Sequence, residues 1–109
     1  MTFLQVTMLN RLADIFKKPH RSFEAFQIEA STYSALECPT CPREIFGERW
    51  IFQNMSMETF EKIARFFHLT QWVSFYGWGD PMENEHIFSM LRLAKDKGCL
   101  TGLSTNGTH

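Results

Sequence analysis

The chain contains an apolar run that ends in a loop of glycine and proline, Trp72-Val73-Ser74-Phe75-Tyr76-Gly77-Trp78-Gly79-Asp80-Pro81. The apolar part, residues 72–76, has the length of a buried strand and is too short for a helix. Glycine and proline end regular structure, because glycine allows sharp turns and proline has no N–H to donate. We therefore predict a strand over 72–76 and an exit loop over 77–81.

Two amphipathic helices are predicted on either side of this strand. Ser56 is a good N-cap for the first, whose apolar face would be formed by Met57, Phe60, Ile63, Ala64 and Phe67. The second follows the exit loop, with an apolar face of Ile87, Met90, Leu91 and Ala94 and with Gly98 as the residue after its end. Both sets of positions repeat with the helical period.

Two further strands and an N-terminal helix complete the prediction. Phe26, Ile28 and Ala30 alternate with polar residues, as in a strand with one buried face, and residues 99–104 form the third strand. The helix before them would bury Leu4, Met8, Leu12, Ile15 and Phe16. The order strand, helix, strand, helix, strand predicts right-handed crossovers and an α/β fold with a parallel sheet.

Composition excludes several classes of protein. The 109 residues are 44% hydrophobic, which is enough for a packed core. The formal net charge is -1, so neither nucleic acid nor an anionic membrane surface is an expected partner. The three cysteines are an odd number and no secretory signal opens the chain, so a reducing compartment, the cytoplasm, is expected.

The loop after the first strand carries two cysteines with metal-ligand spacing. It reads Ser34-Ala35-Leu36-Glu37-Cys38-Pro39-Thr40-Cys41, which is a Cys-x3-Cys-x2-Cys pattern whose first sulfur is replaced by oxygen. Thiolates are soft ligands suited to iron–sulfur clusters. Because ligands gather at the carboxyl ends of parallel strands, we expect this loop, the 77–81 loop and residues 104–106 to meet at one edge of the sheet.

Other readings of these residues are open. The cysteine pair could be half of a zinc site, although Cys99 and the histidines lack the familiar short spacing. We expect Cys99 to be a small buried apolar residue. Arg43 and Arg49 are expected at the surface, and the aromatic residues Phe66, Phe67, Trp72, Phe75 and Tyr76 mostly in the core.

These motifs resemble those of the radical S-adenosylmethionine (radical SAM) enzymes over residues 26–109. In that family a CxxxCxxC loop follows the first strand of a partial β/α barrel, and a Gly-Gly-Glu-Pro-like loop follows the second. Ser34, Cys38 and Cys41 fall on the cysteine positions, Gly77 to Pro81 is similar to the second motif, and Ser104-Thr105-Asn106-Gly107 is similar to a motif of the third strand.

The resemblance implies a fold, two cofactors and a set of site residues. The fold would be the N-terminal part of a partial TIM-like barrel over residues 26–109, after an N-terminal helix and linker over 1–25. A 4Fe–4S cluster would be held at Cys38, Cys41 and position 34, and it would cleave S-adenosylmethionine to a 5′-deoxyadenosyl radical after reduction by an electron donor. The cofactor-binding residues would be Thr40, Gly77, Trp78, Gly79, Asp80, Ser104 and Asn106.

This chain departs from the family pattern at defined positions. Ser34 is a hard donor in place of a thiolate. Three explanations stay open: a substitution that blocks the cluster, a natural degenerate copy and a local sequence error. Asp80 stands where Glu is usual, and Thr40 where an aromatic residue is frequent. Whether the chain itself catalyses therefore stays open, and the rival hypothesis is a non-catalytic binding fragment on the same scaffold.

The resemblance also bears on size and substrate. A partial barrel needs further strands, so we expect this chain to be the N-terminal portion of a longer protein. The sequence Cys41-Pro42-Arg43 is similar to that of family members that modify peptides or proteins, which makes a peptide or protein one candidate substrate.

Overall fold

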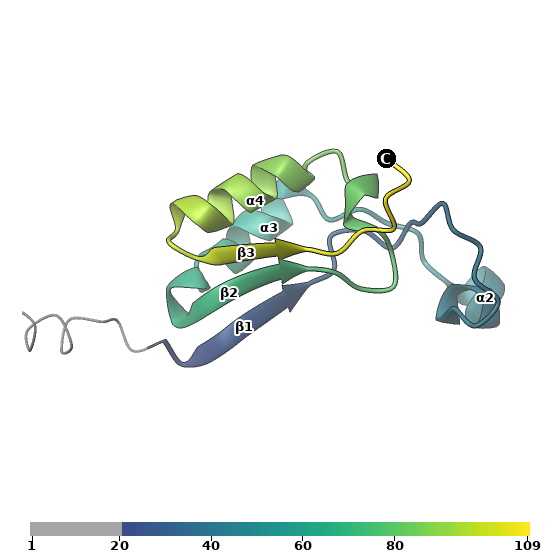
Figure 1. The fold of residues 1–109 in the computed structure, drawn as a ribbon, viewed down its shortest axis with the longest axis horizontal. Helices are drawn as coiled ribbons and strands as arrows, with labels where there is room; N and C mark the ends of the chain where they lie inside the picture. The colour runs from purple at the N-terminus through teal and green to yellow at the C-terminus, as the bar shows by residue number, and fades with distance from the viewer. Residues whose placement is uncertain (1–20) are drawn as a thin grey trace, which may run out of the picture.

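The computed structural model describes residues 21–109, which form an α/β unit around a sheet of three parallel strands in the order β1-β2-β3. The strands are β1 (Phe23–Ile28), β2 (Thr70–Phe75) and β3 (Leu100–Leu103). The helices are α2 (Pro42–Phe46), α3 (Met57–Ala64) and α4 (Ile87–Asp96). Figure 1 shows α3 and α4 next to the sheet and α2 set apart beyond the carboxyl ends of the strands.

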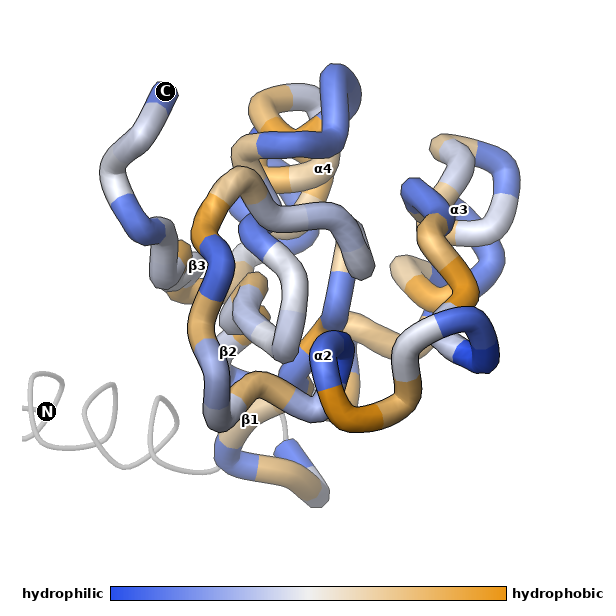
Figure 2. Tube along the Cα trace, turned by 90° about the vertical axis from the view of Figure 1, so that its right-hand side faces the viewer, coloured by the Kyte–Doolittle hydropathy of each residue, from blue (hydrophilic) through white to orange (hydrophobic). Residues whose placement is uncertain are grey.

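The two crossover helices cover the same face of the sheet. Figure 2 looks toward the carboxyl ends of the strands, with the three strands on one side and α3 and α4 on the other. Their buried residues form one core with the strands, made of Ile28, Ala30, Phe60, Ala64, Phe67, Val73, Phe75, Ile87, Met90, Ala94 and Cys99. The predicted order of elements and the parallel sheet are confirmed.

The helix ends follow from their local sequence. The Ser56 side chain accepts a hydrogen bond from the Thr59 N–H and caps α3, as predicted. The helix ends at Ala64. Phe67, which was predicted on its apolar face, is buried but belongs to the 3-10 turn that follows. Gly98 directly follows Lys97, the C-cap residue of α4, and has a positive φ of 81°. Glycine is favoured at this position, because the backbone there is left-handed.

Several boundaries differ from the prediction. β1 begins at Phe23, before residue 26, and ends at Ile28, while β2 begins at Thr70 and ends at Phe75. The segment after Cys41, predicted as irregular, contains the short helix α2, which Pro42 opens at a position where a missing N–H costs nothing. The predicted N-terminal helix lies outside the described residues.

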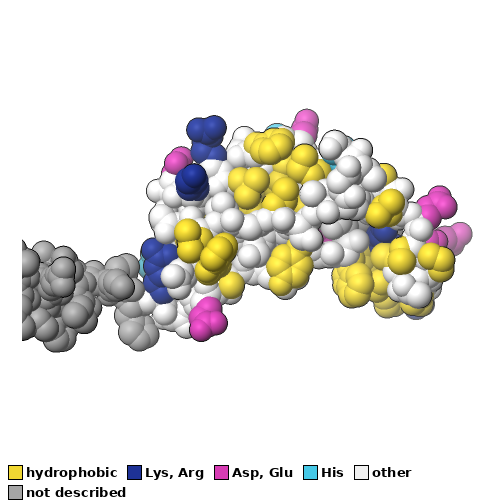
Figure 3. Space-filling view, viewed as in Figure 1, with side chains coloured by type: hydrophobic (Ala, Val, Ile, Leu, Met, Phe, Trp, Pro, Cys, Tyr) yellow, Lys and Arg dark blue, Asp and Glu magenta, His cyan; other side chains and the backbone are white. Residues whose placement is uncertain are grey.

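The second face of the sheet has no covering layer among residues 21–109. Trp72 pairs with Leu100 in register, and both alternate with residues that face the helices, so they point to the opposite face. Both are exposed, as are Phe66 and Tyr76, and Figure 3 shows hydrophobic side chains over this face and around α2. The core prediction is therefore confirmed for Phe67 and Phe75 and wrong for the other three aromatic residues.

No helix within residues 21–109 combines the length and the apolar character that crossing a membrane requires.

Candidate functional site

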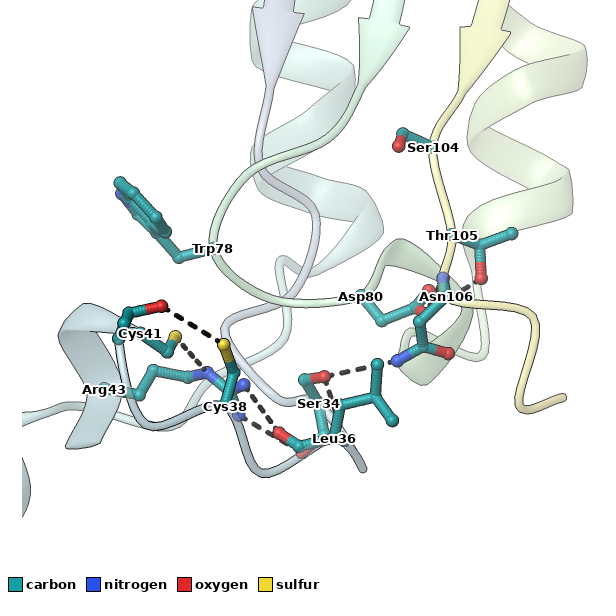
Figure 4. A pocket seen from close by; sticks show the side chains of 11 residues that line it. Ser34, Leu36, Cys38, Cys41, Arg43, Trp78, Asp80, Ser104, Thr105 and Asn106 are labelled. Carbon is teal, nitrogen blue, oxygen red and sulfur yellow. Dashed lines mark hydrogen bonds between the residues drawn. The ribbon is translucent and has the colours of Figure 1, made fainter.

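Three loops meet at the carboxyl ends of the strands and enclose one open pocket of about 360 Å³. Each loop follows a different strand, and parallel strands bring such loops to the same edge of the sheet. Figure 4 shows the side chains that line the pocket, which belong to Ser34, Leu36, Cys38, Thr40, Cys41, Arg43, Trp78, Asp80, Ser104, Thr105 and Asn106. The structure thus brings together the two cysteines, position 34 and most of the cofactor-binding residues expected from the sequence.

The cysteine loop closes in a turn that leads into α2. The Cys41 N–H donates to the carbonyl of Cys38 at 2.9 Å, and the Cys41 carbonyl accepts from the Glu44 N–H at 3.0 Å. Cys41 is the residue that caps the helix, and it is buried, whereas Cys38 is exposed. Both thiols are free and both line the pocket.

The thiol of Cys38 has a lowered pKa. Its sulfur lies 3.4 Å from the Thr40 hydroxyl oxygen in a hydrogen bond. That side-chain bond is the largest cause of the lowered pKa, and the backbone of Thr40 and the charge of Arg43 act in the same direction. Thr40, expected near a bound cofactor, thus supports the thiolate form of its neighbour.

Arg43 is buried at this site, with 8% of its surface exposed, so its expected surface position is wrong. Its Nε donates to the sulfur of Cys41 at 3.2 Å, and its two terminal nitrogens donate to the carbonyls of Ser34 at 3.2 Å and Leu36 at 2.9 Å. Figure 4 shows the guanidinium inside the curve of the cysteine loop. The reason for the burial is this set of acceptors, which the turn at 38–41 brings around the side chain.

Ser34 faces the third loop across the pocket. Its hydroxyl oxygen accepts from the Leu36 N–H and from the Asn106 side-chain amide, each at 3.3 Å. The first and third loops are therefore joined through the position that holds oxygen in place of sulfur.

The glycine loop lies directly against the end of β1. A Cβ at Gly79 would overlap the carbonyl of Ser31, and a Cβ at Gly77 would overlap the carboxyl group of Glu29. That carboxylate accepts hydrogen bonds from the N–H groups of Trp78 and Gly79. Glu29 is a site residue that sequence reasoning missed, because its partners lie 49 and 50 positions away.

The hydrogen bonds of Glu29 also orient two carbonyl groups. In a trans peptide the C=O points opposite to the N–H of the next residue, and the structure has no cis peptide bond in its described part. The carbonyls of Gly77 and Trp78 therefore point away from Glu29. No residue within 21–109 donates a hydrogen bond to either of them.

Asp80 is a buried clamp between the second and third loops, with 4% of its surface exposed. One carboxylate oxygen accepts from the Met82 N–H at 2.9 Å, and the other accepts from the Thr105 hydroxyl and the Asn106 N–H, both at 2.8 Å. Burial by itself raises the pKa of Asp80, but these hydrogen bonds outweigh it and hold the pKa below its ordinary value. The three hydrogen bonds that stabilise the charged carboxylate therefore all come from the protein itself.

The other predicted residues lie at the rim. Trp78 is 60% exposed and stands at the pocket wall. Ser104 donates its N–H to the carbonyl of Phe75 at 3.1 Å, which continues the sheet hydrogen bonding while its side chain stays exposed at the pocket. Leu36 and Thr105 also line the pocket and were not predicted as site residues.

The donor set fits an iron–sulfur cluster at two of the three positions that the family resemblance implies. Cys38 and Cys41 supply sulfur, and Ser34 supplies a hydroxyl, which is a poor ligand for iron in such clusters. Residues 21–109 contain no group of three or more His, Cys, Asp or Glu side chains that could hold a metal ion. The zinc alternative thus finds no third ligand of these types in this part of the chain.

Cys99 has different surroundings from Cys38 and does not line the pocket. It lies in the core, where its thiol donates to the carbonyl of Phe67 at 3.4 Å, and burial raises its pKa. Its predicted role as a small buried residue is confirmed.

The comparisons with known proteins give no relative for this chain. No protein-family model matches it, and neither does any curated protein or solved structure.

Proposed function

We propose that the pocket is a cofactor site of the radical SAM type, in which Cys38 and Cys41 ligate a 4Fe–4S cluster beside bound S-adenosylmethionine. The observation that supports this proposal is the convergence of the cysteine pair, Ser34 and the two following loops on one pocket. Each motif is weak alone, but three loops that resemble the family in order also meet in space. When bound and reduced, such a cluster supplies the electron that cleaves S-adenosylmethionine.

The residues of this chain would orient the second cofactor in specific ways. The carbonyls of Gly77 and Trp78, turned away from Glu29, are acceptors for its ammonium group. The hydroxyl of Ser104 and the amide of Asn106 are at the opposite wall, where they can bind ribose or carboxylate oxygens. Trp78 offers an exposed ring at the rim for packing against an apolar surface.

The proposal also includes a barrel-like fold for the whole domain, the partners and the location. The exposed sheet face and the outer strands β1 and β3 fit the N-terminal part of a partial TIM-like barrel, in which further strands would continue the sheet. A peptide or protein substrate, an electron donor for the cluster and a cytoplasmic location complete the proposal, and the free thiols fit a reducing compartment.

Anaerobic reconstitution with iron and sulfide tests the proposal. We expect the wild-type chain to take up a brown, sulfide-containing species only weakly, and Ser34→Cys to retain more of it, because the third position then offers a thiolate. Cys38→Ala in the Ser34→Cys background should abolish it. Cys99→Ala in that background is the matched control and should leave it intact, because Cys99 lies in the core. Equal iron in the Cys38→Ala and Cys99→Ala variants would refute the assignment of the cysteine pair.

A second candidate is a binder of S-adenosylmethionine without a cluster. It is favoured by one observation, the acceptance by Ser34 of a hydrogen bond from Asn106, which gives this position a role that needs no metal. Titration calorimetry of the iron-free wild-type chain separates the two candidates. Binding of S-adenosylmethionine without iron, together with a colourless Ser34→Cys protein, would support the binder.

A further inference from the structure

The outer edge of β1 is free within the described part of the chain. The sheet order is β1-β2-β3, so β2 pairs with only one side of β1, and Figure 1 shows no described strand along the other side. The carbonyl of Ile28 accepts from the Tyr76 N–H, so the polar groups of Ile28 face the chain of β2. Because these groups alternate in direction along a strand, the N–H and C=O groups of Ala25 and Gln27 point outward. No backbone hydrogen bond beyond the sheet itself reaches them within residues 21–109.

A groove runs along this edge. A cavity of about 370 Å³ is lined by the consecutive residues 25–29 together with Met55 and Ile63. Successive side chains of a strand face opposite sides, so a cavity that touches all of them in a row lies against the backbone edge. A second cavity of about 290 Å³ shares Glu29 and Met55 with the first. The two cavities therefore adjoin and extend the groove past Glu29.

The groove has an apolar wall and a carboxylate at each end of its lined stretch. Phe26, Met55 and Ile63 are partly buried apolar side chains that pack against the core. Glu24 precedes the lined stretch of β1 and Glu29 ends it, and the ion pairs within residues 21–109 involve neither of them. One oxygen of the Glu29 carboxylate accepts from the glycine loop, while the other has no donor in this part of the chain. The edge thus offers backbone hydrogen bonds, an apolar wall and two carboxylates.

We propose that this edge binds an extended peptide, which adds a strand beside β1, places an apolar side chain in the groove and carries a basic residue on either side of it. Free sheet edges bind extended segments in this way, since main-chain hydrogen bonds give affinity and pockets for alternate side chains give specificity. The basic residues would face Glu24 and Glu29, because complementary charges across an interface favour one partner over others. Binding at this edge goes beyond the proposed function and needs no cofactor.

Amide hydrogen exchange of the wild-type chain, followed by NMR, tests the proposal with the peptide acetyl-Thr-Lys-Thr-Ile-Thr-Lys-Thr-amide. Without peptide, the outward amides of Ala25 and Gln27 should exchange fast and the inward amides of Phe26 and Ile28 slowly, because only the inward ones bond to β2. With about 90% of the chain bound, exchange at both outward amides should slow by about tenfold, since the free fraction exchanges as before. The same peptide with N-methyl groups on its three central residues should leave them unprotected, because it lacks the N–H donors of a strand.

A proline on the edge tests the outward hydrogen bonds from the side of the protein. Ala25→Pro removes an outward N–H and keeps the bonds to β2, because an edge strand tolerates proline where the missing N–H faces outward. The affinity for the peptide should fall by about 3- to 10-fold, the usual effect of one hydrogen bond. Ala25→Val keeps the donor and is the matched control, which should bind as the wild-type chain does. Equal affinities of these two variants overturn the proposal, and the exchange measurement decides it if Ala25→Pro does not fold.

The exchange data also separate the proposed occupant from others. No binding of the peptide, or binding that leaves Ala25 and Gln27 unprotected, overturns the proposal. Slow exchange of both amides without peptide and at any protein concentration would show that a segment of this chain covers the edge. Protection that increases with protein concentration would show that a second copy covers it. Either result replaces the peptide as the occupant and overturns the proposal.

Discussion

Replacement of Asp80 by asparagine tests the clamp that holds the second and third loops together. The carboxylate is buried and accepts three hydrogen bonds, from the N–H groups of Met82 and Asn106 and from the hydroxyl of Thr105. Asparagine has the same shape but only one acceptor oxygen. That oxygen can serve the Met82 side or the third-loop side, and on the other side an NH2 group faces an N–H donor.

The free energy of unfolding should fall by about 2–4 kcal/mol in Asp80→Asn. Each hydrogen bond to a charged group contributes about 1.5–3 kcal/mol, and a buried donor left without an acceptor adds its own cost. A loss of about 2 kcal/mol lowers the folding equilibrium constant roughly 30-fold. The difference in the free energy of unfolding between the wild-type chain and Asp80→Asn should also depend on pH.

Urea denaturation at pH 7 measures this loss. Asp96→Asn is the matched control, because Asp96 is an exposed residue at the end of α4, and its effect should stay within about 0.5 kcal/mol. In the wild-type chain Asp80 has a lowered pKa, so its contribution is complete above the ordinary aspartate value of about 3.9 and is lost as the pH falls through the lower folded value. Asp80→Asn should lack that acid-dependent part. Equal stability of the two variants at pH 7 would refute the clamp.

Three further changes test the packing around the site, each read from urea or thermal unfolding. Gly79→Ala should destabilise the chain far more than Gly102→Ala, because a Cβ at Gly79 overlaps backbone whereas a Cβ at Gly102 meets only the Ser74 hydroxyl at an ordinary 3.4 Å; similar midpoints would contradict the close approach of the glycine loop. Glu29→Ala should cost about 2 kcal/mol, since two backbone N–H groups lose their acceptor, and no loss would mean that water replaces the carboxylate fully. Phe60→Ala should cost about 3–5 kcal/mol, because its ring is fully buried between α3 and the sheet, and Phe88→Ala, with 65% exposure on α4, should cost far less; equal costs would contradict the assignment of the core face.

The hydroxyl of Ser34 has consequences for the Ser34→Cys experiment. In the iron-free chain it accepts from Asn106 at 3.3 Å, and sulfur is a weaker acceptor for that bond. Ser34→Cys therefore exchanges a link between the first and third loops for a third soft ligand. A loaded cluster would have to replace that link, which is why iron retention and stability should be measured on the same preparations.

The elements could be predicted because their signals are local. Alternation around Ile28, the capping residue Ser56 and the glycine after α4 each act within a few residues of chain. The parallel order then follows from chain connectivity, since strands joined through helices run in the same direction. Helix α2 escaped prediction because a five-residue helix is too short to show a period.

The site could be predicted in outline for a related reason. The carboxyl ends of parallel strands share one edge, so the order of the motifs already places the cysteine pair and the loops after β2 and β3 together. The aromatic residues show the limit of such reasoning. Hydrophobicity alone does not tell Phe75 from Trp72, because successive residues of a strand face opposite sides and only one side of this sheet is covered by helices.

Local patterns in the sequence were enough to predict the three strands, the two crossover helices, the parallel order of the strands and the edge at which the three loops meet. The roles of the charged side chains at that edge became visible only in the fold: Arg43 ties the cysteine loop, Glu29 holds the glycine loop and Asp80 clamps the third loop. A charge that is wholly or partly withdrawn from water is placed by the acceptors or donors that surround it. For Glu29 and Asp80 those partners are brought near only by folding, from positions as far as 50 and 26 residues along the chain.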